Sequence, residues 1–232
     1  MQPRDNVDRF YAVVQKHGYG EVPARDVYDL FGNTAASGLD GFTTVKPGFY
    51  AREVTGDVAH VVKLQAVKGL TYTVWWGVSL SYLPHVQGGR VRWHRTLKAA
   101  RLDLFETPFD YFELTHEDRE ETGRFCAYAG HRIEYLRESM TRAWSAVDDP
   151  IRSWFAGTQD VASVLVKAEE QRTRQWRGPR HDPDPRLVCA FTLDRLGRGA
   201  DARDVLDAYL RDSGAREPDV GLLRGALRPL VP

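Results

Sequence analysis

One segment restricts the fold more than any other: residues 71–83, with the sequence TYTVWWGVSLSYL. Its even-numbered side chains, from Tyr72 to Tyr82, are all apolar, whereas its odd-numbered ones are mostly small or polar. This period of two is typical of a β-strand with one buried face and one wetter face. Trp75 is an exception, because this large aromatic residue falls among the polar positions. Either helices cover that second face as well, or Trp75 is an exposed anchor for a partner.

Further strands are expected on both sides of this segment. Residues 58–67 predict a strand with Val62 and Leu64 inward, and the short connection at residues 68–70 predicts an antiparallel hairpin with 71–83. Residues 48–54 are expected to pair on its other side, across a turn at Thr55, Gly56 and Asp57. A fourth strand near 97–106 completes an antiparallel meander.

Helical patterns flank these strands. Apolar residues at helical spacing predict one helix near residues 5–18 and a short one after Pro23. After residue 117 the strand patterns stop, and residues 117–147 predict one long helix that ends at Asp149 and Pro150. Further helices are expected near residues 151–155, 160–175, 186–196, 201–212 and 218–230. The predicted fold class is therefore α+β, with a sheet domain of four to five strands (1–115) and an all-helical C-terminal subdomain (116–232).

Composition limits the function classes. Lys and Arg total 32 and Asp and Glu total 32, so the formal net charge is zero, which argues against general nucleic-acid binding but not against a local patch. The first residues lack the apolar stretch of a signal peptide, and no run of 18 apolar residues predicts a membrane span. Cys126 and Cys189 lie in apolar runs typical of buried free thiols. We therefore expect a cytoplasmic protein that does not contact membranes.

The segment from Asp40 to Pro84 resembles a bacterial family called domain of unknown function 4304. The resemblance rests on Gly41-Phe42, the strand from Gly48 to Arg52, the strand from Val61 to Gln65 and the strand from Tyr72 to Val78. It covers roughly residues 25–85. It implies an α+β fold with a curved antiparallel sheet, and it carries neither an established activity nor catalytic residues.

No catalytic or metal-binding pattern is present in the sequence. It has no CxxC, HExxH, GxSxG or phosphate-loop motif, and Lys63 and Lys68 lack the preceding acid of a restriction-type nuclease site. We expect no cofactor and no metal. An enzyme of unrecognised type stays as an alternative, and it would have to gather acids such as Glu113, Glu117 and Asp118 near a histidine.

Two basic segments are candidates for contact with an anionic partner. Residues 90–95 place three arginines around Trp93, and residues 172–181 place four arginines around Trp176 without any acid. Arginine beside an aromatic ring suits phosphate contact and base stacking. The alternative is that the first segment is an edge strand protected by charge and the second a solvated linker.

The leading hypothesis is a non-enzymatic protein that binds another protein through the face of Trp75. Such a protein could be an immunity or antitoxin-like factor, or a subunit of a bacterial defence or regulatory complex. The residues expected around this contact are Trp75, Lys63, Gln65, Arg52 and Arg101. The alternative hypothesis is a nucleic-acid-associated accessory protein that uses Arg90, Arg92, Trp93, Arg95, Arg174, Trp176 and Arg177.

Overall fold

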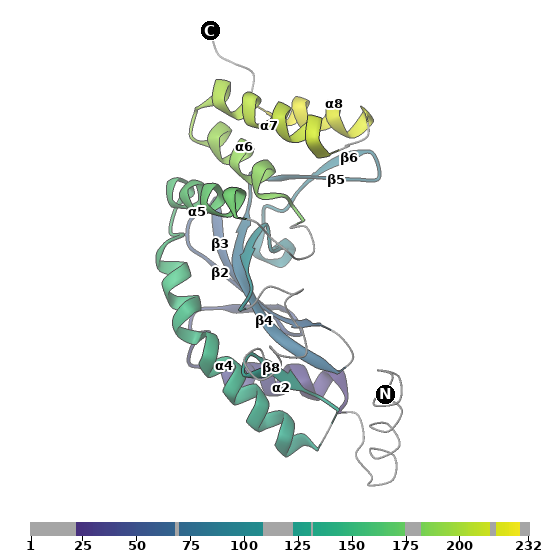
Figure 1. The fold of residues 1–232 in the computed structure, drawn as a ribbon, viewed down its shortest axis with the longest axis vertical. Helices are drawn as coiled ribbons and strands as arrows, with labels where there is room; N and C mark the ends of the chain where they lie inside the picture. Colours follow the sequence, from purple (N-terminus) through teal and green to yellow (C-terminus); the bar gives the residue numbers. More distant parts are fainter. Residues whose placement is uncertain are drawn as a thin grey trace, which may run out of the picture.

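The computed structural model describes residues 22–67, 70–108, 123–130, 132–174, 182–213 and 217–227. It confirms the α+β class, with one large sheet and helices packed along it (Figure 1). The helices are α2 (Ala24–Ala35), α4 (Ile133–Ala156), α5 (Val161–Thr173), α6 (Pro185–Arg195), α7 (Gly199–Ser213) and α8 (Glu217–Ala226). The strands are β1 (Thr43–Lys46), β2 (Phe49–Glu53), β3 (Val58–Ala66), β4 (Thr71–Leu80), β5 (Pro84–Gln87), β6 (Arg90–Trp93), β7 (Leu104–Glu106) and β8 (Cys126–Tyr128). The helix predicted near residues 5–18 lies outside the described residues.

The large sheet is an antiparallel array built around β3 and β4. Its order is β1-β2-β3-β4-β7, and β8 pairs with another part of β4. The predicted pairing of β2 with β3 and of β3 with β4 is confirmed, with Val62 opposite Trp76 and Lys63 opposite Trp75. The fourth strand is shorter than predicted, because residues 97–99 form a 3₁₀ turn (η1) and only β7 joins the sheet.

The two faces of the sheet are covered differently. The even-numbered side chains of β4 pack into the main core with α2 and α4, where Phe31 contacts Tyr50 and Phe155 stacks on His60. The opposite face has a small cluster of its own: Phe49, Ala51, Val61, Val45, Leu97, Ala100 and Leu102. This cluster lies under the residues around η1 rather than under a long helix. The helices therefore cover one face, and η1 covers part of the other.

The prediction for residues 117–147 was wrong in two respects. Residues 126–128 form strand β8, which pairs with residues 71–73 of β4, so strands do continue after residue 117. The long helix is α4, and it continues through Pro150 to Ala156. A proline inside a helix removes one backbone hydrogen bond and costs about 3 kcal/mol. Burial on both sides of the proline offsets that cost, since Val147, Ile151 and Trp154 all lie in the core.

The last helices lie together at one end of the sheet with a separate hairpin, β5–β6 (Figure 1). Gly88 and Gly89 join the two strands of this hairpin with φ values of 60° and 70°. Two consecutive positive φ values define the tight turn that matches the twist of a hairpin, and glycine adopts them without strain. Helix α8 packs against β5 and β6. The division into units 1–115 and 116–232 stays a prediction, although β8 belongs to the sheet.

Candidate functional site

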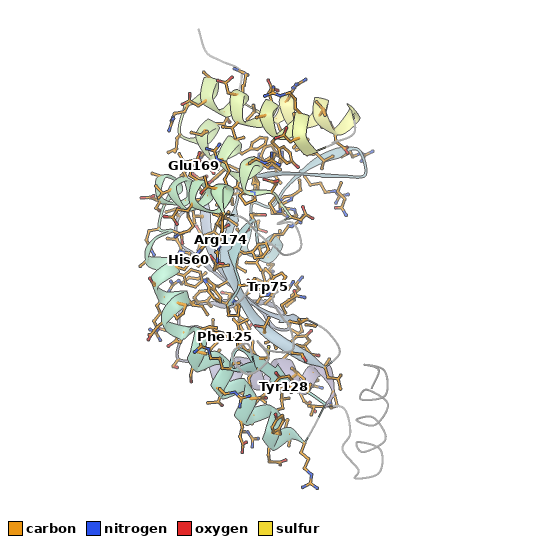
Figure 2. All side chains as sticks on the ribbon, viewed as in Figure 1. His60, Trp75, Phe125, Tyr128, Glu169 and Arg174 are labelled. Atoms are coloured by element: carbon orange, nitrogen blue, oxygen red, sulfur yellow. The ribbon has the colours of Figure 1, made fainter. Side chains whose placement is uncertain are left out.

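Trp75 lies on the face of the sheet that the long helices do not cover. The ring of Trp75, which is labelled in Figure 2, stacks on Phe105 of β7. The two centroids are 5.1 Å apart and the planes are 8° from parallel. The Trp75 side chain is half-buried, and so are its neighbours Lys63 and Gln65 on β3. Strand alternation explains this placement, because Lys63 is directly opposite Trp75 and Gln65 is opposite Thr73. We call Trp75, Phe105, Lys63 and Gln65 the Trp75 surface.

Two lysines lie over aromatic rings on this face. Lys63 Nζ is 5.6 Å from the centre of the Trp75 ring, and Lys46 Nζ is 5.1 Å from the centre of the Phe49 ring. Burial lowers the pKa of Lys63, and the positive charge of Lys46 lowers it further. Among the described residues neither lysine forms an ion pair. This face of the sheet thus combines stacked aromatic rings with two positive charges that have no counter-charge among the described residues.

The structure places the other two expected neighbours elsewhere. Arg52 was predicted on the Trp75 face, and this was wrong: it pairs with His60 on the opposite face. There its Nη2 donates to His60 Nδ1 at 3.3 Å, and its guanidinium lies 4.9 Å from the Phe42 ring. Arg101 is at the far end of the Trp75 face, where its backbone N–H donates to Ser79 Oγ at 3.1 Å. Of the four expected neighbours, Lys63 and Gln65 are therefore the two that lie beside Trp75.

A buried carboxylate fixes the segment that leads to β7. Asp103 is fully buried, and its Oδ2 accepts a hydrogen bond from the Leu80 N–H at 2.7 Å. Its Oδ1 lies 3.0 Å from His85 Nε2 of the hairpin. The His85 ring in turn packs against the ring of His94, with the two ring centroids 4.7 Å apart. Burial lowers the pKa of His94, and the neighbouring His85 lowers it further. Asp103 therefore joins the edge of the sheet to the hairpin and has a structural role.

The first basic segment forms part of the β5–β6 hairpin and the chain after it. Residues 84–101 contain five Lys or Arg residues and no Asp or Glu. Arg90, Arg92 and Arg95 are exposed, and within the described part of the chain none of them makes an ion pair. Trp93 is half-buried, with the Arg95 guanidinium 5.4 Å above its ring. The sequence pattern indicated these arginines but not the hairpin, although a Gly88-Gly89 pair between two short extended stretches is a hairpin signal.

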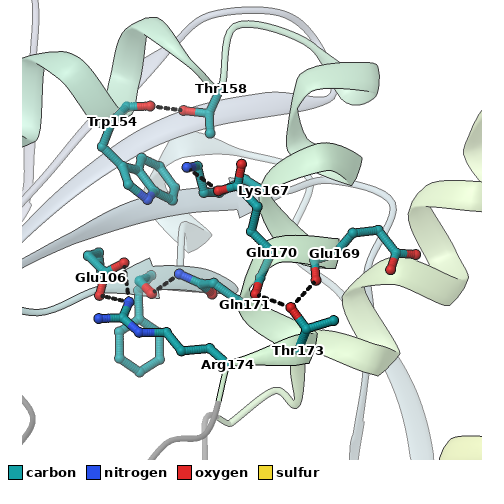
Figure 3. Close-up of polar contacts among 10 residues, drawn as sticks. Glu106, Trp154, Thr158, Lys167, Glu169, Glu170, Gln171, Thr173 and Arg174 are labelled. Carbon is teal, nitrogen blue, oxygen red and sulfur yellow. Dashed lines mark hydrogen bonds and ion pairs between the residues drawn. The ribbon is translucent and has the colours of Figure 1, made fainter.

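The second basic segment is engaged within the protein as far as the structure describes it. Arg174 Nη1 donates to both carboxylate oxygens of Glu106, at 3.0 and 2.9 Å (Figure 3). Burial raises the pKa of Glu106, and the charge of Arg174 opposes that rise. Gln171 Nε2 donates to the Phe105 backbone oxygen at 2.7 Å, so α5 and the residue that follows it hold β7 in two places. Trp176 and Arg177 lie outside the described residues.

The two cysteines provide no reactive thiol. Cys126 and Cys189 are both free and buried, and burial raises their pKa values to about 11 and about 12. A thiol with so high a pKa stays protonated at neutral pH and is a poor nucleophile. Across the residues that the structure describes, no group of three His, Cys, Asp or Glu side chains could hold a metal ion. Glu113, Glu117 and Asp118 lie outside those residues.

Comparison of the chain with protein-family models, with curated proteins and with solved structures gives no match. The resemblance to domain of unknown function 4304 therefore stays a prediction. Within its described part the chain forms no helix long and apolar enough to cross a membrane. The two features of the described structure that bear on function are the Trp75 surface and the β5–β6 hairpin.

Proposed function

We propose that this chain is a non-catalytic binding protein that contacts a protein partner through the Trp75 surface. The observation that carries the proposal is the Trp75–Phe105 stack, half-buried on the sheet face opposite α2 and α4. Tryptophan is among the residues that contribute most to protein–protein affinity, because it removes a large apolar area from water in a rigid form. A role in a bacterial defence or regulatory complex, or as an immunity-like factor, fits such a surface.

The charges around the stack favour a partner with acidic residues. Lys46 and Lys63 have no acidic counterpart among the described residues, and the desolvation of Lys63 raises the energy of its charged form. A carboxylate brought by a partner would stabilise both ammonium groups and leave the aromatic rings to bury apolar area. Complementary charge of this kind speeds association and excludes partners of the wrong sign.

The test is affinity capture from the native host extract, treated with nuclease, with matched variants as bait. Lys63→Glu reverses a charge on the surface without removing the stack, and Trp75→Ala removes its central ring. Val166→Ala is the control, because Val166 is 60% exposed on α5 and lies outside the Trp75 surface. We expect one stoichiometric protein with the unmodified bait and with the control, and its loss with both surface variants. No stoichiometric protein, or capture that is the same with every bait, would refute the proposal.

A second candidate function is association with nucleic acid through the hairpin. The observation in its favour is the run of five cations in residues 84–101, which contains no acid. Each phosphate neutralised by such a cation releases counterions, so affinity would fall steeply with salt. Binding of single- or double-stranded DNA or RNA that weakens in Arg90→Gln/Arg92→Gln and at higher salt would support this candidate. Salt-independent binding, or no binding, would eliminate it.

A further inference from the structure

A cavity lies between the hairpin and the C-terminal helices, away from Trp75. Its volume is about 350 Å³, which is within the range of small-molecule sites. It is lined by residues from the β2–β3 turn, the end of β4, the end of β6, α6 and α8: Asp57, Ser81, Tyr82, Trp93, Arg95, Phe191, Asp194, Arg195 and Ala226. Segments far apart in the sequence therefore meet around one space.

The polar groups on one side of this cavity are held in fixed positions. Arg195 Nε and Nη2 bind Asp57 Oδ2 at 2.9 and 2.8 Å, and Ser81 Oγ donates to Asp57 Oδ1 at 3.2 Å. Thr192 Oγ1 donates to the Val188 oxygen, so the Tyr82 hydroxyl is the donor in its 3.1 Å bond to Thr192. These bonds leave Arg195 Nη1 without a partner in the described structure. They also fix the carboxylate of Asp57 as the counter-charge of Arg195.

The other side of the cavity carries a positive charge that no described carboxylate neutralises. Arg95 has no ion pair among the described residues, and its guanidinium lies 5.4 Å above the Trp93 ring. Asp194 is only 8% exposed and already has a partner of its own. The positive charge of Arg95 is therefore the one that a ligand in this cavity would meet uncompensated. Phe191 adds a second aromatic ring to the lining.

We propose that this cavity binds a nucleotide, either free or at the end of a strand. Arg95, with the free Nη1 of Arg195, binds the phosphate, because guanidinium groups match phosphate oxygens in geometry and charge. The half-buried ring of Trp93 provides the aromatic surface on which a base stacks, whereas Phe191, which is only 2% exposed, adds apolar lining. The site is separate from the Trp75 surface, so the inference does not depend on a protein partner.

The test is calorimetric titration of the full chain with each of the four 5′-ribonucleoside monophosphates, and with adenosine and inorganic phosphate as partial ligands. Trp93→Leu and Arg95→Gln remove the ring and the charge. Arg137→Gln is the matched control, because it removes an exposed charge from α4, outside the cavity. We expect at least one monophosphate to bind more tightly than either partial ligand. Its affinity should fall about tenfold or more in both cavity variants and stay unchanged in the control.

A short 5′-phosphorylated single strand distinguishes the two sources of the ligand. If only the strand binds, with the same dependence on Trp93 and Arg95, the ligand is a strand end. The proposal is overturned if neither mononucleotides nor the strand bind, if the cavity variants bind as the unmodified protein does, or if inorganic phosphate binds as tightly as the nucleotides. Trp75→Ala is expected to leave nucleotide binding unchanged, which separates this result from that for the protein partner.

Discussion

Acid is expected to destabilise this protein through His60, which lies fully buried between the sheet and α4 (Figure 2). Its ring stacks on Phe155 with centroids 4.2 Å apart. Arg52 can only donate, so His60 Nδ1 must accept from Arg52 Nη2, and Nε2 carries the proton that it donates to the Thr158 oxygen at 3.0 Å. The native site therefore holds a neutral ring whose two nitrogens are both satisfied.

The expected loss of stability in acid follows from the pKa of the His60 ring. The pKa of His60 falls from 6.5 to about 4, chiefly because the ring is buried; the bond to Thr158 opposes the fall and the charge of Arg52 adds to it. Above pH 6.5 the ring is neutral in both folded and unfolded chains and contributes no pH dependence. Between pH 6.5 and 4 the unfolded chain binds a proton that the folded chain does not bind. One unit of pKa is worth about 1.4 kcal/mol, so stability falls by about 3 kcal/mol over this range.

The assay is urea unfolding, followed by circular dichroism, between pH 7.5 and 4 for the unmodified protein and for His60→Gln. The glutamine amide can donate to Thr158 but does not titrate, and carboxylates elsewhere contribute equally to both proteins. Between pH 7.5 and 4, we expect the free energy of unfolding of the unmodified protein to fall by about 3 kcal/mol more than that of the variant. A native-state NMR titration should also show one histidine with a midpoint near 4. Equal losses in the two proteins, together with all histidines titrating near 6.5, would refute the reasoning.

Two further predictions concern single contacts in the fold. A Cβ on Gly77 would lie 2.1 Å from the Leu104 backbone oxygen, so Gly77→Ala should lower the free energy of unfolding, measured in urea, by about 1–3 kcal/mol. Gly221 has open space around it, so Gly221→Ala should raise the free energy of unfolding by up to about 1 kcal/mol. Equal effects of the two substitutions would contradict the close approach of β4 and β7. Asp160 Oδ1 accepts from the Ser163 N–H at 2.7 Å in a capping box, so Asp160→Ala should lower the free energy of unfolding by about 1 kcal/mol. An unchanged denaturation midpoint would show that this cap does not stabilise α5.

Local patterns predicted the parts of the fold that depend on neighbours in sequence. Strands β2, β3 and β4 follow each other through short turns, so alternation alone defined their pairing and put Lys63 beside Trp75. Strand β8 pairs with a segment more than 50 residues away, and no local signal marks such a partner. The course of α4 through Pro150 depends on burial of Ile151 and Trp154, which overrides the local preference to end the helix.

The residues of the candidate sites also divide into those that the sequence indicated and those that only tertiary packing brings together. Trp75 was recognisable because a large ring interrupted a polar alternation, and the arginines of residues 90–95 were recognisable by composition. Arg52 was placed on the wrong face, since a difference of one residue in strand register moves a side chain across the sheet. The cavity at Trp93 could not be predicted, because Asp57, Arg195 and Ala226 meet there only through tertiary packing.

The most direct test of the central claim is the affinity of the captured protein partner for variants of the Trp75 surface, measured by calorimetry. Truncation of a hot-spot residue at the centre of an interface costs about 2 kcal/mol or more, which corresponds to about 30-fold in affinity. We predict a loss of about this size for Trp75→Ala, a comparable loss for Lys63→Glu and no change for Val166→Ala, with all three variants folded as judged by their thermal unfolding. Unchanged affinity in both folded surface variants would show that the partner binds elsewhere and would contradict the account.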